Sequence, residues 1–331
     1  LENKLAKKII SEVPSAEMVR FAKNGSDVTS AAIRLSRMIT KKKIVLTCGY
    51  HGWHEWYIGK TTMNAGIPNE MFVNTKTFKF NDINSFEKIF NKNKKNIAAV
   101  ILEPMNIDWP KIKFLKKIRA ICSKNNSILI FDEICTGFRF SLGGAQKLFG
   151  ITPDLTTLGK GMGNGFPISA LAGKRKLMKK CDKIFFSSTF GGETLSLVSA
   201  ISVIDFIKKK NVIEKINYLG NKILVEINKH LDRKKIDFIK IKGHPSWSFF
   251  IFEDYKKYSK ETLKTYFLEK SIEKGLLTFG TNNLNYSHKT NEINKIINIY
   301  KIILSDIKNQ IDLNKKLINY KEIKNLFQVR K

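Results

Sequence analysis

A short apolar run that ends in two adjacent carboxylates constrains the fold of this chain more than any other stretch. Residues 128–131 are Ile, Leu, Ile and Phe, and Asp132 and Glu133 follow them directly. A continuous apolar run of this length is typical of a strand buried on both faces of a parallel sheet. Because open α/β sheets bind ligands beyond the carboxyl ends of their strands, we expect both carboxylates to face a site rather than bulk solvent.

The stretches on either side of this run extend the same pattern. Apolar residues at 44–47 and 96–102 predict two earlier strands, and helical spacing of apolar residues predicts a helix over 111–124. A strand, a helix and a strand in this order form the parallel α/β unit. Residues 166–172 and 184–188 predict two later strands. The sequence therefore predicts an α/β domain built on a mostly parallel sheet.

One lysine differs from the many others in its neighbours. The chain has 59 Lys and Arg residues, so most lysines are expected to be solvated surface charges. Lys160 stands between Gly159 and Gly161 in the run GKGMGNGFP. Flanking glycines let the backbone and a ligand approach closely. A lysine in a desolvated pocket is the usual group that forms a Schiff base with an aldehyde.

Two turns that contain Gly and hydroxyl residues precede predicted helices. Gly25 and Ser26 come before a helix with apolar residues at helical spacing up to Ile39, and Ser26 or Asp27 is expected to cap it. The second turn is 187–192, with the sequence SSTFGG. Free N–H groups and the positive end of the helix dipole can bind a phosphate at such a turn, although most turns of this kind only cap their helix.

His51 and His54 follow the strand at 44–47, but no third ligand is suggested, so no metal site is predicted. The four cysteines are widely spaced and form no C-x-x-C pair, which argues against zinc and disulfides and for a reducing cytoplasm. Cys135 lies near the two carboxylates. We interpret it as a small core residue.

The formal net charge of +30 raises nucleic acid or an anionic membrane as an alternative partner. The lysines are dispersed over the whole length, and no nucleic-acid-binding motif accompanies them. A basic nucleic-acid-binding protein is therefore disfavoured. No apolar stretch reaches the roughly 18 residues that a membrane span needs, and the first ten residues are too charged for a signal peptide. We expect no nucleic-acid or membrane partner.

The pattern changes after about residue 210. Strands at 238–241, 246–252 and 276–279 alternate with helices near 213–230, 260–274 and 290–309. Such an alternation with its own apolar faces predicts a separate α+β domain. We therefore divide the chain into a large domain, 1–210, and a small C-terminal domain, 211–331.

The motifs around Lys160 resemble those of the class III pyridoxal-phosphate (PLP) aminotransferases. GFR, LGGAQ, FGITPDL and LGK stand in order without a gap, and within the family they are most similar to glutamate-1-semialdehyde 2,1-aminomutase. The resemblance runs from about Val19 to about His288. It implies a fold-type I large domain that binds PLP, followed by the smaller domain. A family member carries a further segment before Leu1, so we expect the chain to be N-terminally incomplete.

The resemblance also implies roles for individual residues. Lys160 is expected to form the Schiff base with PLP and to act afterwards as the general base. Asp132 is expected to keep the ring nitrogen protonated, because PLP is an electron sink only in that form. Tyr50 is expected to stack on the ring, and Gly25 and Ser26 to bind the phosphate.

In the family, the Thr of the second turn reaches the cofactor of the other subunit. The resemblance therefore implies a homodimer with a shared active site, in which Thr189 makes that contact. One departure concerns the neighbouring position, because Glu193 stands where the aminomutases have Asn. We therefore expect an aminotransferase that uses an amino donor and a carbonyl acceptor, with the aminomutase that forms 5-aminolevulinate as the alternative. The sequence does not identify the substrates.

Overall fold

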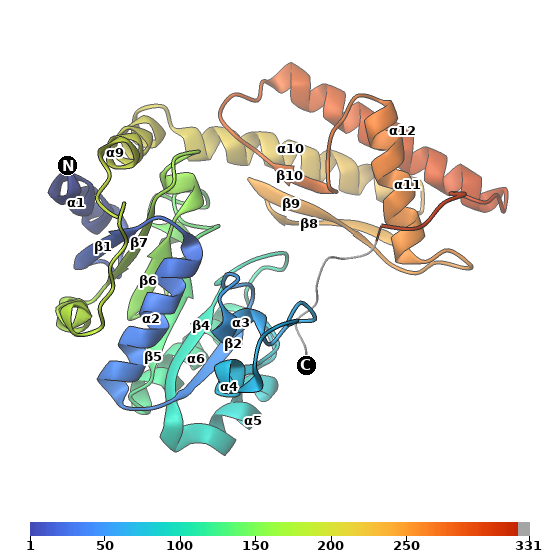
Figure 1. The fold of residues 1–331 in the computed structure, drawn as a ribbon. Coiled ribbons are helices and arrows are strands. Elements are labelled where there is room, and N and C mark those ends of the chain that lie inside the picture. Colours follow the sequence, from blue (N-terminus) through green and yellow to red (C-terminus); the bar gives the residue numbers. More distant parts are fainter. Residues whose placement is uncertain (324–331) are drawn as a thin grey trace. The chain divides into compact units, whose positions relative to one another are not determined.

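The structure is a computed structural model that describes residues 1–323 (Figure 1). It divides into two compact units. Of the described residues, the first contains Leu1–Asn106 and Pro110–Lys210, and the second contains Ile107–Trp109 and residues 211–323. Every helix of the described chain is too short or too polar to cross a bilayer.

The first unit is built on a seven-stranded sheet with the order β1-β7-β6-β5-β4-β2-β3. Strand β7 is antiparallel to both of its neighbours, and the other adjacent pairs are parallel. This confirms the predicted α/β class with a mostly parallel sheet. The strands are β1 Met18–Ala22, β2 Ile44–Cys48, β3 Thr75–Thr77, β4 Ile97–Leu102, β5 Ile128–Asp132, β6 Leu155–Leu158 and β7 Ser169–Gly173.

Helices cover both faces of this sheet. The α-helices of the unit are α1 Glu2–Glu12, α2 Gly25–Thr40, α3 Glu55–Ile58, α4 Asn69–Phe72, α5 Ile83–Asn93, α6 Ile112–Lys124, α7 Gly144–Phe149, α8 Arg175–Met178 and α9 Thr194–Lys209. Single 3₁₀ turns lie at Lys94–Asn96, Lys160–Met162 and Cys181–Lys183. Together they bury the apolar side chains that both faces of the strands carry.

The alternation of side chains along β5 sorts its residues between the two faces. Ile128 and Ile130 pack in the core that contains α2, whereas Leu129 and Phe131 pack in the core that contains α5 and α6. Successive residues of a strand point to opposite faces. Asp132 therefore points to the face of α2.

The second unit combines a three-stranded antiparallel sheet with three helices. Its sheet has the order β10-β9-β8, with β8 Ile239–His244, β9 Trp247–Phe252 and β10 Thr281–Asn283. The helices are α10 Val212–Arg233, α11 Lys260–Glu273 and α12 Thr290–Asp312. Their inner faces and alternate residues of β8 form one apolar core. The α+β character predicted for this part of the chain agrees with these elements.

Two predicted strands are absent, and a third is displaced. Residues 184–188 form turns and irregular backbone, with Phe185 86% exposed at a φ of +40°. Residues 276–279 carry the exposed side chains Leu277 and Phe279, and the strand follows them as β10. The strand predicted at 166–172 begins only at Ser169. Apolar runs were the signal in each case, but these side chains remain in solvent where no neighbouring strand or helix covers them.

Candidate active site

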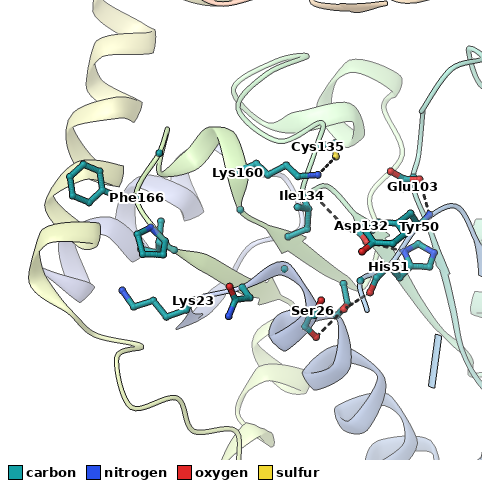
Figure 2. Close-up of a pocket in the computed structure, with 18 residues that line it drawn as sticks. Lys23, Ser26, Tyr50, His51, Glu103, Asp132, Ile134, Cys135, Lys160 and Phe166 are labelled. Atoms are coloured by element: carbon teal, nitrogen blue, oxygen red, sulfur yellow. Dashed lines mark hydrogen bonds and ion pairs between the residues drawn. The ribbon is translucent and has the colours of Figure 1, made fainter. Parts of the chain in front are cut away.

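One cavity of the first unit is lined by five of the six predicted site residues. Its volume is about 390 Å³. Asp132, Lys160, Tyr50, Gly25 and Ser26 all line it, although they come from four separate parts of the chain (Figure 2). The remaining lining residues are Lys23, Asn24, Thr29, His51, Gly52, Glu103, Ile134, Cys135, Gly159, Gly165, Phe166, Pro167 and Ile168.

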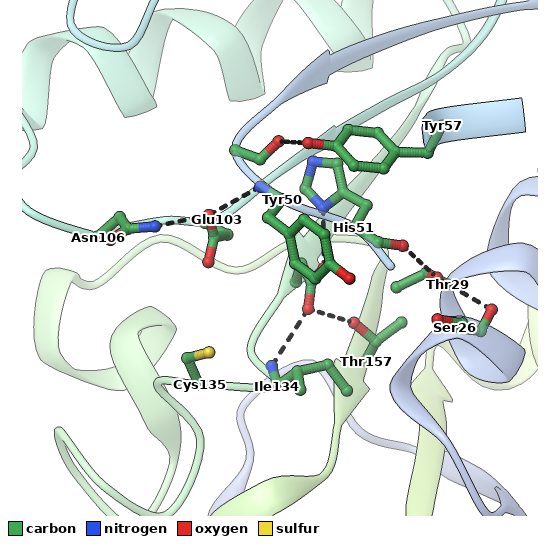
Figure 3. Close-up of polar contacts among 12 residues, drawn as sticks. Ser26, Thr29, Tyr50, His51, Tyr57, Glu103, Asn106, Ile134, Cys135 and Thr157 are labelled. Atoms are coloured by element: carbon green, nitrogen blue, oxygen red, sulfur yellow. Dashed lines mark hydrogen bonds and ion pairs between the residues drawn. The ribbon is translucent and has the colours of Figure 1, made fainter. Parts of the chain in front are cut away.

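The Asp132 carboxylate is buried and held by three donors. Its Oδ1 accepts from the Thr157 hydroxyl at 3.0 Å and from the Ile134 N–H at 3.2 Å (Figure 3). Thr157 lies directly opposite Asp132 in the β5–β6 pairing, so its side chain is on the same face of the sheet. Oδ2 lies 2.8 Å from His51 Nδ1. These contacts fix the plane of the carboxylate.

His51 is a site residue that the sequence did not reveal as a partner of Asp132. Because a carboxylate only accepts hydrogen bonds, the proton on this contact belongs to His51 Nδ1. The His51 side chain is fully buried, and no atom of the described residues pairs with its Nε2. His54 instead shares a hydrogen bond of 2.7 Å with the Ser30 hydroxyl. Within residues 1–323, no group of three His, Cys, Asp or Glu side chains could hold a metal.

The prediction that both carboxylates face a site is wrong for Glu133. Being the next residue after Asp132, it points to the other side of the chain, where it accepts from the N–H groups of Ala145 at 2.6 Å and Gln146 at 2.8 Å and from the Thr136 hydroxyl. Burial raises the pKa of the Glu133 carboxyl. It satisfies the first N–H groups of α7 and does not line the cavity.

Lys160 reaches the cavity from a strained backbone position. Its φ is +39°, in the left-handed region that side-chain-bearing residues rarely adopt. The Nζ donates to Cys135 Sγ at 2.7 Å (Figure 2). Cys135 is partly exposed in the cavity, so its interpretation as a core residue is wrong. Burial lowers the pKa of the Lys160 amine, but Cys135, Asp132 and Glu103 together outweigh this and raise it.

The N-terminus of α2 forms another wall of the cavity. The helix begins at Gly25, and Asn24 is its N-cap, with Asp27 bonded back to the Asn24 N–H at 2.9 Å. The prediction that Ser26 or Asp27 caps the helix is therefore wrong by two or three residues. The N–H groups of Gly25 and Ser26 belong to the first turn, which has no acceptors within the helix. They are available to an anion.

Close contacts fix the position of the first turn of α2 against the loop after β2. The Ser26 hydroxyl oxygen accepts from the Trp53 N–H at 3.2 Å. Gly52 has a φ of +100°, and a Cβ at this position would lie 2.3 Å from Ser26 Oγ. The loop after β2 can therefore pass the start of α2 only because residue 52 has no side chain.

Tyr50 and Glu103 form the wall beside Asp132. Tyr50 is 43% exposed, and its backbone N–H donates to Glu103 Oε2 at 2.9 Å (Figure 3). Asn106 donates to the same oxygen at 2.9 Å. Burial, reinforced by the Asp132 charge, raises the pKa of Glu103. Glu103 is a second lining carboxyl group that the sequence analysis did not single out, because a Glu-Pro pair after a strand resembles an ordinary strand end.

Thr189 is the one predicted site residue outside the cavity lining. It is exposed, in a turn that ends before α9. The helix begins at Thr194, and Glu193 is its N-cap, accepting from the Leu195 N–H at 2.6 Å. Glu193 also forms an ion pair of 2.8 Å with Lys23, which lines the cavity.

Two solved structures share this fold. The FumI protein of Sphingopyxis sp. MTA144, in a form that contains PLP, superposes with a TM-score of 0.86 at 24% identity, over 94% of this chain and 76% of that one. An omega-transaminase from Sphaerobacter thermophilus gives a TM-score of 0.85 at 22% identity, over 93% and 78%. At these identities the likeness concerns the fold.

Curated relatives are closer in sequence. The chain is 38% identical over 243 residues to a 3-aminobutyryl-CoA aminotransferase of Cloacimonas acidaminovorans, covering 71% of this chain and 58% of that protein. It is 37% identical over 256 residues to a glutamate-1-semialdehyde 2,1-aminomutase of Methanococcoides burtonii, covering 72% and 61%. The chain thus spans about 60% of the length of these two relatives. The model of the class-III aminotransferases matches residues 2–293, and this chain belongs to that family.

Proposed function

We propose that this chain is part of a PLP-dependent aminotransferase whose cofactor binds in the cavity of the first unit. The residues present fit such a group. A cavity of about 390 Å³ is large enough for a small-molecule ligand. It offers N–H groups at a helix N-terminus for an anion, a buried carboxylate for a protonated nitrogen, and an amine for an aldehyde. The joining of these three groups in one cavity carries the proposal.

Each lining residue would hold a different part of PLP. Gly25 and Ser26 would bind the phosphate, and Tyr50 would cover the ring face with its exposed ring. Asp132 would hold the ring nitrogen, and Lys160 the aldehyde carbon. When bound, PLP supplies the electron sink for moving an amino group between carbon skeletons.

Asp132 and Lys160 would hold and transfer the protons of this reaction. Asp132 remains a hydrogen-bond acceptor in a fixed plane because Thr157, Ile134 and His51 hold both of its oxygens. The Lys160 amine, once freed from the cofactor, would accept a proton from the substrate carbon and return it to another position. The raised pKa keeps this amine protonated near neutral pH, so it can accept a proton only after it has first lost one.

The direct test is to find the lysine that carries PLP. The protein is loaded with PLP and reduced with borohydride, and its peptides are mapped by mass spectrometry. We expect the label on Lys160, and a label on another lysine would overturn the assignment. Lys160→Ala should abolish turnover. Asp132→Ala should retain bound PLP yet lose most of the rate, because the ring nitrogen then lacks its partner.

Aminotransferase and aminomutase remain the two candidate reactions, and relatives of both names match the chain. We favour the aminotransferase because Glu193 replaces the aminomutase Asn and is bonded to Lys23 in the cavity wall. To decide, the full-length gene product in its pyridoxamine form is incubated with glutamate-1-semialdehyde and no amino donor. Rapid catalytic formation of 5-aminolevulinate would establish the mutase. Turnover that requires a donor such as glutamate would support the aminotransferase.

We also propose a cytoplasmic homodimer with shared sites. All four cysteines are free, in keeping with a reducing compartment. Thr189 is exposed between large apolar side chains that also face solvent, Phe185, Phe190 and Leu195. Such a patch favours contact with another chain. Mixing Lys160→Ala with Thr189→Ala subunits should restore activity through one intact site per mixed dimer. Mixed dimers without activity would refute the shared site.

A further inference from the structure

The neighbour of the Lys160 amine is a thiol. Lys160 has a long flexible side chain that reaches an open cavity, and Cys135 Sγ lies 2.7 Å from its Nζ (Figure 2). Cys135 comes three residues after Asp132, in the loop that leaves β5. The Lys160 side chain is thereby turned toward the side of the cavity where Asp132 lies.

We propose that Cys135 is a positioning residue of the candidate active site, whose sulfur holds the Lys160 amine in place and influences when that amine carries a proton. The proposal rests on the proposed function only in taking Lys160 as the reactive amine. A residue that restrains the reacting group in advance lowers the cost of reaching a productive geometry. The thiol acts through Lys160 and is assigned no contact with substrate.

The charges around the pair are consistent with mutual influence. Burial raises the pKa of the Cys135 thiol, and the Lys160 ammonium opposes that rise. Cys135 in turn raises the pKa of Lys160, as do Asp132 and Glu103. Two interacting groups titrate as a pair, so a change at either one must alter the other. Arg139 also interacts electrostatically with Cys135, and Tyr50 and His51 line the same cavity.

The burial of the other three cysteines allows the reactivity of Cys135 to be measured separately. Cys48, Cys122 and Cys181 are buried, and Cys135 alone of the four cysteines is partly exposed. A thiol reagent such as iodoacetamide should therefore modify Cys135 first, because only a reachable thiolate reacts. The Lys160 amine can be followed in the same cavity with acetic anhydride, through its peptide in a mass spectrum.

The experiment uses the full-length gene product with its cofactor removed, so it does not depend on turnover. Acetylation of Lys160 is measured across a pH series in wild type, Cys135→Ala, Cys135→Ser and the control Cys181→Ser. Without the sulfur, we expect the midpoint to fall, so that the acetylation rate of Lys160 at a fixed pH below the midpoint rises about tenfold. Cys135→Ser retains a hydrogen-bonding hydroxyl and should give an intermediate midpoint. Cys181→Ser should match wild type.

The reciprocal measurement covers the case in which a cysteine variant fails to fold. In Lys160→Met, the Cys135 thiol loses the cation that lowers its pKa, so its alkylation should slow several-fold at a fixed pH. A Lys160 midpoint in Cys135→Ala equal to that of Cys181→Ser would overturn the proposal, as would unchanged alkylation in Lys160→Met. If PLP were found on another lysine, the proposed function would fail, but these measurements would still decide whether Cys135 and Lys160 affect one another.

Discussion

Asp132 Oδ2 and His51 Nδ1 lie 2.8 Å apart, with the aspartate side chain 4% exposed and the histidine fully buried. Asp132 ends β5, and His51 lies three residues beyond β2. These strands are not adjacent, because β4 lies between them. The pair therefore depends on the packing of the sheet edge and not on a local turn.

Replacing His51 should reduce the rate without removing the cofactor. An Asn side-chain nitrogen can take the place of Nδ1, whereas a Gln nitrogen falls nearer to Nε2. We expect His51→Gln to lower kcat by about 10- to 100-fold, the equivalent of one lost hydrogen bond to a charged group. His51→Asn should retain most of the rate. His54→Ala, which removes contacts with Ser30 and Trp53 but none with Asp132, serves as the control. Equal losses in the Asn and Gln variants would contradict a role through Asp132.

Asp132 and Glu133 should separate function from stability. In Glu133→Gln, an amide NH₂ replaces one of the two oxygens and faces the N–H group of either Ala145 or Gln146. A buried donor left without an acceptor costs about 1–3 kcal/mol. We therefore expect the Tm of Glu133→Gln to fall, while the variant still binds PLP and turns over its substrate. Asp132→Asn should do the reverse and lose activity with little change in Tm, because its oxygen still accepts from Thr157 and Ile134 while His51 can move its proton to Nε2 and accept from the new amide. Calorimetry and steady-state rates on the two variants check this, and a stable but inactive Glu133→Gln would count against it.

The contact between Gly52 and Ser26 predicts a specific loss of cofactor affinity. Gly52→Ala places a Cβ 2.3 Å from Ser26 Oγ at a φ of +100°. Gly66 is the matched control, since its φ is +77° and a Cβ there meets no atom within 4 Å. Both variants should lose stability through backbone strain, by about 1–2 kcal/mol.

Only Gly52→Ala should also displace Ser26, which we propose to bind the phosphate. We expect its Kd for PLP to rise about tenfold, in line with the loss of one phosphate-binding hydrogen bond. Absorbance titration of the cofactor-free protein measures this. The hypothesis fails when Gly66→Ala weakens PLP as much as Gly52→Ala does.

The ion pair between Lys23 and Glu193 should make stability depend on pH. The hydrogen bonds from Lys23 and Ser196 hold the pKa of Glu193 at about 2, below its ordinary value of 4.5. A lowered carboxyl pKa contributes stability that is complete above the unfolded value and is lost as the pH falls toward the folded one. The difference in Tm between wild type and Glu193→Gln should therefore be constant near neutrality and shrink below about pH 4.5.

Lys23→Met is the matched variant, because it removes the same pair from the other side. Its Tm difference from wild type should shrink over the same pH range. A difference that stays constant down to about pH 3 would show that the charge on Glu193 does not contribute.

Much of the site was readable in the sequence because strand ends and glycines have local signatures. The apolar run before Asp132 predicts a buried strand. The polar residue that follows such a strand lies at the carboxyl edge of the sheet, where open α/β sheets bind their ligands. The glycines around Lys160 indicate close backbone approach. Gly25 and Ser26 mark a helix start. Each of these features depends on a few consecutive residues, so no tertiary contact is needed to recognise it.

What the tertiary structure decided is which of those residues meet. The pleat of β5 places Asp132 on the sheet face that packs against α2. Glu133 points away from that face and accepts a hydrogen bond from the first turn of α7. The sheet order brings His51 to Asp132 across an intervening strand. Lys160 has a left-handed backbone conformation, and its amine donates a hydrogen bond to the sulfur of Cys135, a residue 25 positions earlier in the chain. These are contacts between distant segments, and no periodicity of one segment specifies them, because their geometry arises only when the whole sheet packs.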